Sequence, residues 1–125
     1  EFNLPLLLNG RLLAEISGLD PGRVLGPADF QIPNIHLGHF DVFREGKLAD
    51  FYRETIENLT PGLHMILVHP AYDDQEMKEI TRDHPNFGSA WRQIDTQFFS
   101  STQCKDLLRK KGVQMINWKE IQKLL

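Results

Sequence analysis

Apolar residues recur along the chain with two spacings, which predict an alternation of strands and helices. The clearest helix covers residues 47–59, where five apolar or aromatic side chains share one face: Leu48, Phe51, Tyr52, Ile56 and Leu59. Short apolar runs predict strands at residues 3–8, 63–68 and 113–117. Further helices are expected at residues 75–81, 91–99, 101–111 and 118–124. Residues 11–34 are expected to be mostly loop with a helical turn at 11–17, and residues 35–40 are a short strand or a loop.

The order of these elements predicts an α/β fold with parallel strands and outer helices. Strands that are separated by helices are joined by right-handed crossovers, which makes neighbouring strands parallel. Three strands are too few to close a barrel. We therefore expect residues 1–125 to form a single domain that is the carboxyl-terminal portion of a larger, TIM-barrel-like (β/α) barrel.

The predicted strand at 63–68 stops at His69-Pro70, and a polar loop with Tyr72, Asp73 and Asp74 follows. Proline cannot donate to a strand ladder, so the strand ends there. In parallel sheets the carboxyl ends of strands carry the chemistry. His69 is therefore a candidate reactive residue, and the alternative is a loop histidine beside a strand end. Asp73 and Asp74 are either cation ligands or, for Asp74, the N-cap of the next helix.

A second candidate feature is Arg92, which precedes Asp95 by three residues on a predicted helix. At this spacing the two side chains are able to pair. They either present a charged face to a site, where arginine binds carboxylates or substrate oxygens, or form a surface pair of little energetic value. The bulky neighbours of this helix, including Trp91, favour substantial burial. We expect the His69 ring to lie in a polar cleft near Arg92 or Asp95.

Other constellations give weaker indications. His36 and His39 have a spacing that suits a metal, but Gly38 lies between them and helical periodicity is missing, which favours loop histidines. The single cysteine, Cys104, excludes an internal disulfide framework and is interpreted as a packing residue. The sequence contains no glycine-rich phosphate loop, no GxSxG elbow and no CxxC pair.

Composition narrows the function classes without choosing one. The chain has a formal net charge of -3, 41% hydrophobic residues and 25% charged residues, which is typical of a globular protein and gives no support for nucleic-acid binding. No apolar run approaches the roughly 18 residues of a membrane span. With one cysteine and no secretory signal, a cytoplasmic location is expected.

Three segments together resemble the carboxyl-terminal half of the YdjC/ChbG-like carbohydrate deacetylases: "GLHMILVHPAYDD", "WRQID" and "SSTQCKDLLRKKGVQMINWKEI". In that family a strand ends in His-Pro-Gly or His-Pro-Ala, and a helix with Arg and an acidic residue follows. A serine-capped helix and a final strand come next. Residues 2–6 and 33–40 are also similar to family segments, although Asn34 stands where the family usually has Asp.

The resemblance implies roles for individual residues. His69 matches the strand-end histidine, a general acid or substrate contact, and Arg92 and Asp95 match the charged pair that supports the pocket. Substrate-binding residues are expected among four further positions: His36, Tyr72, Asp74 and Trp91. The substrate implied is an amino sugar or chito-oligosaccharide, whose acetamido group is hydrolysed with the help of a divalent metal, magnesium or zinc.

The family's metal ligands lie in an "ADDFG"-type motif and an "H-x-H"-type motif, and neither occurs here. Residues 1–125 are therefore expected to be the last part of a longer protein, without a tightly bound metal and inactive alone. Two alternatives are a non-catalytic sugar-binding module, with Tyr72, Phe87 and Trp91 stacking on the ligand, and an assembly piece whose strand edges drive formation of a homodimer.

Overall fold

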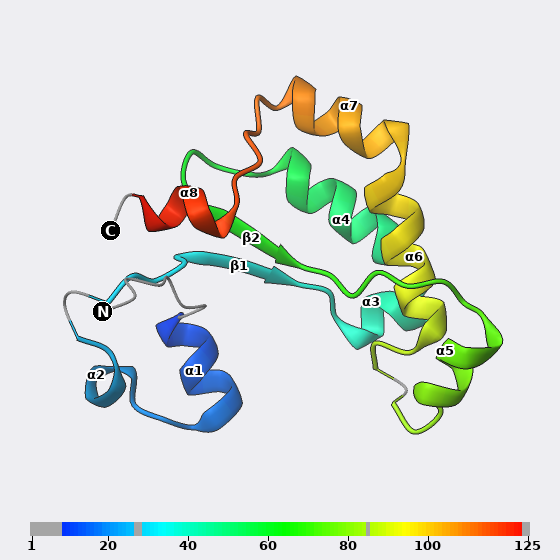
Figure 1. The fold of residues 1–125 in the computed structure, drawn as a ribbon, viewed down its shortest axis with the longest axis horizontal. Helices are drawn as coiled ribbons and strands as arrows, with labels where there is room; N and C mark the ends of the chain where they lie inside the picture. Colours follow the sequence, from blue (N-terminus) through cyan, green and yellow to red (C-terminus); the bar gives the residue numbers. More distant parts are fainter. Residues whose placement is uncertain (1–8, 27–28, 85, 124–125) are drawn as a thin grey trace. The chain divides into compact units, whose positions relative to one another are not determined.

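Short helices and two strands make up the described part of the chain, residues 9–26, 29–84 and 86–123, in a computed structural model (Figure 1). The strands are β1 (Asn34–Leu37) and β2 (His64–Leu67). The helices are α1 (Gly10–Ser17), α2 (Pro21–Val24), α3 (Phe40–Arg44), α4 (Leu48–Glu57), α5 (Gln75–Ile80), α6 (Ser89–Ser100), α7 (Thr102–Lys110) and α8 (Trp118–Gln122). None of these helices is long and apolar enough to cross a membrane.

The two strands pair in a parallel sheet, as their arrows in Figure 1 show. This confirms the predicted α/β class and the strand expected at 63–68. Of the two alternatives for residues 35–40, a short strand or a loop, the structure has a strand that ends at Leu37. The predicted third strand at 113–117 is wrong, because these residues form no strand and Met115 is 74% exposed. A strand needs a hydrogen-bonded neighbour, and no described residue supplies one there. The strand predicted at 3–8 lies outside the described residues.

The chain divides into two compact units. The first contains residues 1–35, 62–65 and 115–125, and the second contains residues 36–61 and 66–114. In the first unit, α1 begins where the Asn9 side chain accepts a hydrogen bond from the Leu12 N–H, and it ends at Gly18, whose φ is 65°. The same unit contains α8, where Asn117 and Glu120 form a capping box. Side-chain caps therefore set the amino-terminal ends of these two helices, and a left-handed glycine ends α1.

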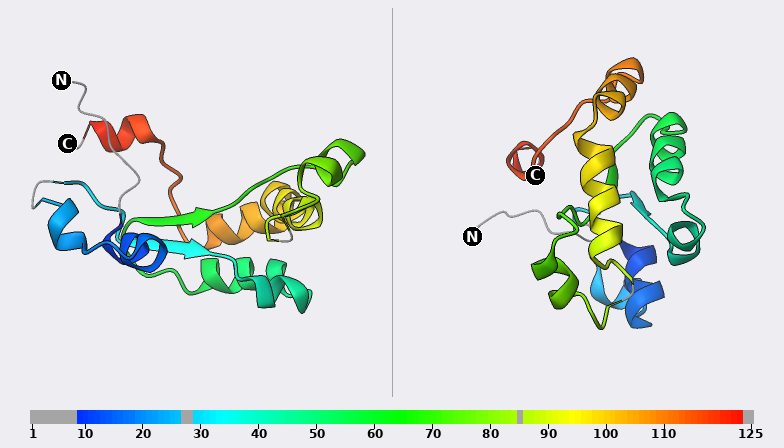
Figure 2. Two further views of the ribbon diagram at one scale, coloured as in Figure 1. Left: turned by 90° about the horizontal axis from the view of Figure 1, so that it is seen from below. Right: turned by 90° about the vertical axis from the view of Figure 1, so that its right-hand side faces the viewer.

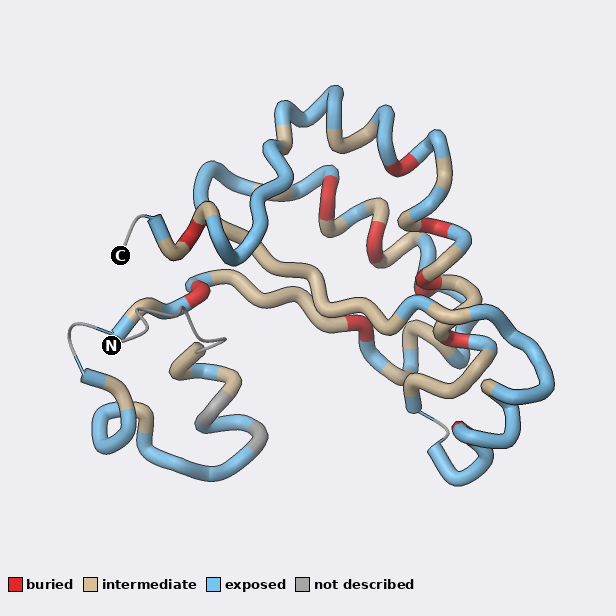
Figure 3. The backbone as a smooth tube through the Cα atoms, in the orientation of Figure 1, coloured by how far each residue is buried: buried red, intermediate tan, exposed pale blue. Residues whose placement is uncertain are grey.

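The second unit contains the larger core, which forms where α4 packs on α6 and α7. Along α4, Leu48, Tyr52 and Ile56 lie one turn apart and are fully buried. Figure 3 shows the buried positions recurring along α4 and α6. The chain bends between α6 and α7, the yellow and orange helices of Figure 2. Ser101 ends α6 and caps α7 by accepting from the Cys104 N–H. The helices predicted at 47–59, 75–81, 91–99, 101–111 and 118–124 are confirmed with small shifts of their ends.

At Gly38 the backbone passes close to two side chains of this core. A Cβ atom added there would lie 2.8 Å from Leu48 Cδ1 and 2.8 Å from Trp91 Cζ2, closer than real Cβ contacts. We expect Gly38→Ala to lower the free energy of unfolding by about 1–3 kcal/mol, because two buried side chains must move. Urea denaturation measures this. Gly22→Ala is the control, since its Cβ would meet only the Asp20 side chain at 3.4 Å, and an equal loss there would contradict the overpacking argument.

Candidate functional site

His69 lies two residues beyond the end of β2, at the strand end where the sequence predicts it. Its backbone N–H donates a hydrogen bond of 2.7 Å to Asp95 Oδ2. Its ring packs against Phe87, with 4.7 Å between ring centroids, and its Nδ1 is buried without a hydrogen-bond partner in the described structure. The prediction of a polar cleft around the ring is therefore wrong for the part of the ring that packs on Phe87. Asp95 contacts the backbone of His69, not its imidazole.

Asp95 is a fully buried carboxylate, with 0% of its surface exposed. Besides the His69 N–H, it accepts a hydrogen bond of 2.6 Å from the Tyr52 hydroxyl to Oδ1. Burial, followed by this hydrogen bond to Asp95, raises the pKa of Tyr52 well above its usual value. The hydroxyl thus stays protonated and remains a donor. Each oxygen of this buried carboxyl group thus accepts one hydrogen bond.

Arg92 does not pair with Asp95 among the described ion pairs, so the charged pair expected from the sequence is not formed. Arg92 Nε donates instead to the Phe87 carbonyl at 2.7 Å. Phe87 has φ 61°, a left-handed backbone conformation that is uncommon for a bulky residue. Arg92 thus stabilises an unusual backbone at the residue whose ring packs on His69. The physical reason for the missing pair is that Asp95 lies on the buried face of α6.

The loop after β2 is tied to α6 at several further points. Thr96 Oγ1 donates to the Ala71 carbonyl at 2.9 Å, and the Asp73 N–H donates to Gln93 Oε1 at 2.8 Å. The Ala71 N–H also reaches the Arg92 carbonyl at 3.4 Å. Together with the bond from His69 to Asp95, these contacts fix residues 69–73 along one side of the helix. A loop held in this way presents its side chains in a defined geometry.

The four residues expected to bind substrate lie in different surroundings. Tyr72 is 70% exposed, and Asp74 accepts from the Met77 N–H as the N-cap of α5. Trp91 is only 1% exposed, because its ring lies between Phe43, at 5.2 Å, and Phe87, at 4.7 Å. His36 is half-buried in β1. Their binding roles stay predictions, and Trp91 is placed as a core residue.

The described residues do not fit a divalent metal by themselves. Across 9–26, 29–84 and 86–123, no three histidine, cysteine or acidic side chains gather as ligands would. His39 is exposed, and its ring lies edge-on to Phe51. Asp73 lies 3.6 Å from the Lys78 ammonium group, and Asp74 caps a helix. The interpretation of Asp74 as a cap is thus supported, and no chemical step is assigned here to a metal.

Comparison with known families adds a finding to this geometry. The family model described as YdjC-like protein matches residues 11–110 of the 125-residue chain. The chain belongs to the YdjC-like family. The match includes every candidate site residue, from His36 to Asp95, and ends before the segment at 113–117. No curated protein matches the chain significantly.

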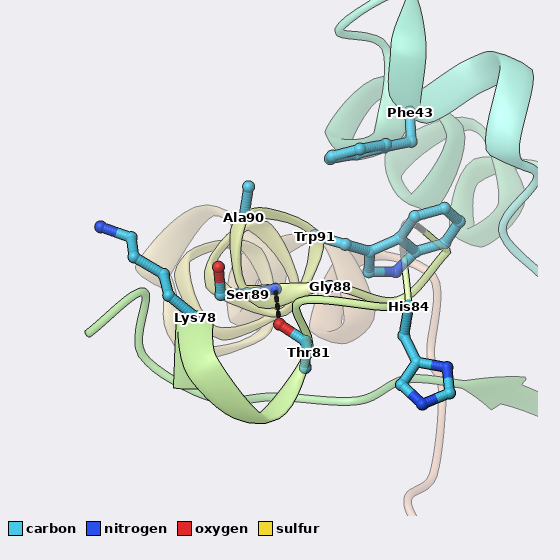
Figure 4. Close-up of a pocket in the computed structure, with 8 residues that line it drawn as sticks. All are labelled: Phe43, Lys78, Thr81, His84, Gly88, Ser89, Ala90 and Trp91. Carbon is cyan, nitrogen blue, oxygen red and sulfur yellow. Dashed lines mark hydrogen bonds between the residues drawn. The ribbon is translucent and has the colours of Figure 1, made fainter. Parts of the chain in front are cut away.

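The YdjC-like chain also has a shallow hollow beside Trp91, with a volume of about 260 Å³. Figure 4 shows its lining: Phe43, Lys78, Thr81, His84, Gly88, Ser89, Ala90 and Trp91. Two of these lining residues are joined, since Thr81 Oγ1 accepts from the Ser89 N–H at 3.1 Å. Ligand pockets usually hold about 300–1,000 Å³, and this hollow is smaller and open. It therefore does not define a ligand site.

The site residue that sequence reasoning missed is Tyr52. Tyr52 lies on the apolar face that the sequence predicts for the helix at 47–59, and its hydroxyl is buried with the ring. A buried tyrosine hydroxyl usually finds a partner, so its position already indicated a buried acceptor elsewhere in this YdjC-like chain. That acceptor is Asp95, 43 residues away in sequence, a distance that no local pattern reveals.

Proposed function

We propose that this YdjC-like chain is the carboxyl-terminal part of a metal-dependent carbohydrate N-deacetylase with a (β/α) barrel. In this proposal the substrate is an amino sugar or chito-oligosaccharide, and the protein hydrolyses its acetamido group. The family match over residues 11–110 supports the proposal at the level of the family. The observation that carries it is the placement of His69, directly beyond β2 and anchored through its backbone to a fully buried carboxylate.

The proposed role of His69 follows from the chemistry of amide hydrolysis. Water adds to the acetyl carbonyl, the C–N bond breaks, and the departing amine must gain a proton. A histidine supplies such a proton readily, since imidazole titrates near neutrality. Because Nδ1 of His69 is buried, we assign the proton transfer to Nε2. The metal and the residues that bind it would come from outside the described residues.

A non-catalytic sugar-binding module is the alternative. It gains support from the exposed ring of Tyr72, which could stack on a sugar. The burial of Trp91 between two aromatic rings argues against this alternative, because the indole offers no face to a ligand. Assembly of two copies into a homodimer stays a prediction of the sequence.

Acetate release from N-acetylated chito-oligosaccharides tests the proposal. We expect the protein encoded by the complete natural gene to release acetate with a divalent metal present, and residues 1–125 alone to release none. We also expect that gene to encode an Asp-Asp motif and an H-x-H motif upstream. Turnover by residues 1–125 alone would contradict the proposal that the metal ligands come from another part of the protein. A tryptophan fluorescence change with oligosaccharide but no acetate from the complete protein would favour the binding module.

A further inference from the structure

Two hydrogen bonds meet on the carboxylate of Asp95, and they join three parts of the second unit. The Tyr52 hydroxyl of α4 binds Oδ1 at 2.6 Å, and the His69 N–H after β2 binds Oδ2 at 2.7 Å. Tyr52 and Asp95 are both fully buried. The arrangement therefore runs from helix to carboxylate to the backbone of the candidate acid.

We propose that Tyr52 and Asp95 are positioning residues that set the location of His69 through its backbone amide. The inference deepens the proposed function and rests on it, because the position of His69 affects a reaction only where its imidazole takes part. Neither residue touches substrate in this proposal. Their effect on the reaction passes through the His69 backbone.

The surroundings of Tyr52 explain why its hydroxyl can fix the carboxylate. Its ring is packed against three phenylalanine rings at centroid distances of 4.9–5.7 Å: Phe51, Phe98 and Phe99. This packing fixes the direction of the hydroxyl. None of the described ion pairs includes Asp95, so the two hydrogen bonds hold the carboxylate in place. If a buried carboxylate loses one of its two donors, one oxygen is left without a hydrogen bond. This is costly, so the side chain is expected to move or to bind water.

The His69 ring is held separately from its backbone. Arg92 Nε fixes the Phe87 carbonyl, and the Phe87 ring packs on the imidazole. With the ring held on one side and the backbone on the other, a shift of the amide changes the direction in which the imidazole points. A displacement of a catalytic group by about 1 Å lowers the reaction rate substantially. In this proposal the amide contact therefore affects activity.

Amide hydrogen exchange of His69, measured by NMR on the 125-residue chain, tests the inference directly. Tyr52→Phe removes the hydroxyl and keeps the ring. Asp95→Asn keeps both contacts possible, since Oδ1 can accept from His69 and Nδ2 can donate to the Tyr52 oxygen. The matched control is Ile56→Val, which trims a fully buried side chain one turn further along α4.

We expect Tyr52→Phe to speed His69 amide exchange by about tenfold or more relative to Ile56→Val, the size expected when a buried polar group loses a hydrogen-bond partner. We expect Asp95→Asn to retain most of the protection. Equal effects of Tyr52→Phe and Ile56→Val, or no effect of Tyr52→Phe, would overturn the inference. If Tyr52→Phe does not fold, Asp95→Ala decides, because His69 protection that stayed at the level of Ile56→Val there would show that the contact with Asp95 does not set it.

Kinetics of the complete natural protein separate this inference from the proposed function. Positioning predicts that Tyr52→Phe lowers kcat with little change in KM, whereas general loss of structure would affect Ile56→Val equally. If the unmodified complete protein released no acetate, the proposed function would fail, and if His69→Ala left acetate release unchanged, only the role proposed for His69 would fail. The exchange experiment would still decide whether Tyr52 and Asp95 position His69.

Discussion

Trp91→Ala is expected to lower the free energy of unfolding by about 3–5 kcal/mol, the range for removing a large buried aromatic side chain. Trp91 is 1% exposed, and it contacts the rings of Phe43 and Phe87. A buried cavity would remain where the indole was, between α3 and α6. Chemical denaturation followed by circular dichroism measures the loss.

The other tryptophan of the chain provides the control. Trp118, at the start of α8, is 42% exposed, so Trp118→Ala should cost far less than Trp91→Ala. Equal losses for the two variants would mean that Trp91 is not a core residue, and its predicted role in stacking on a sugar would regain support. A large difference would confirm its structural role.

The sequence predicted the helices with a regular buried stripe because burial follows their periodicity. In α4 the fully buried residues Leu48, Tyr52 and Ile56 are spaced by four, and this spacing is visible in the sequence. The short helices α2 and α3 were not predicted, since four or five residues give no periodicity. The sequence does contain Asp20-Pro21, a start signal that the structure uses at α2.

The strand predicted at 113–117 shows what a local sequence pattern does not predict. Its residues favour a strand locally, yet strands exist only in pairs, and the pairing partner is not encoded in the segment itself. The same reasoning explains why β1 could not be distinguished from a loop. The strand at 34–37 exists because β2 lies beside it, and local composition gave only a weak indication.

The interpretation of α6 was wrong about which residues act together. Arg92 and Asp95 are three apart, which allows a pair, but Trp91, Asp95 and Phe98 have the four-and-three spacing of a single buried stripe. That stripe indicated that Asp95 faces the core. A buried carboxylate needs donors, and the structure supplies Tyr52 and the His69 amide. The spacing was visible in the sequence, whereas the identity of the donors required the fold.

His69→Ala is expected to reduce kcat of the complete natural protein by about 10²–10⁴-fold, the usual contribution of a general acid. His69 follows β2, its backbone N–H donates to Asp95, its ring packs on Phe87, and its Nδ1 is buried. The bound metal should be retained, because in this proposal its ligands come from outside the described residues and His69 acts as the acid. Acetate release and metal analysis on the same preparation measure both effects.

The control is His84→Ala, which removes an exposed histidine of the same unit and should leave turnover close to the unmodified protein. Each outcome for His69→Ala has a distinct meaning. Loss of metal together with activity would make His69 a ligand, and full activity would make it a loop histidine beside a strand end. Partial recovery of the variant by added imidazole would support proton transfer, since a free imidazole can replace the missing acid only if the missing function is that of an acid. An inactive variant that imidazole does not restore would leave His69 with the other role implied for it, contact with the sugar.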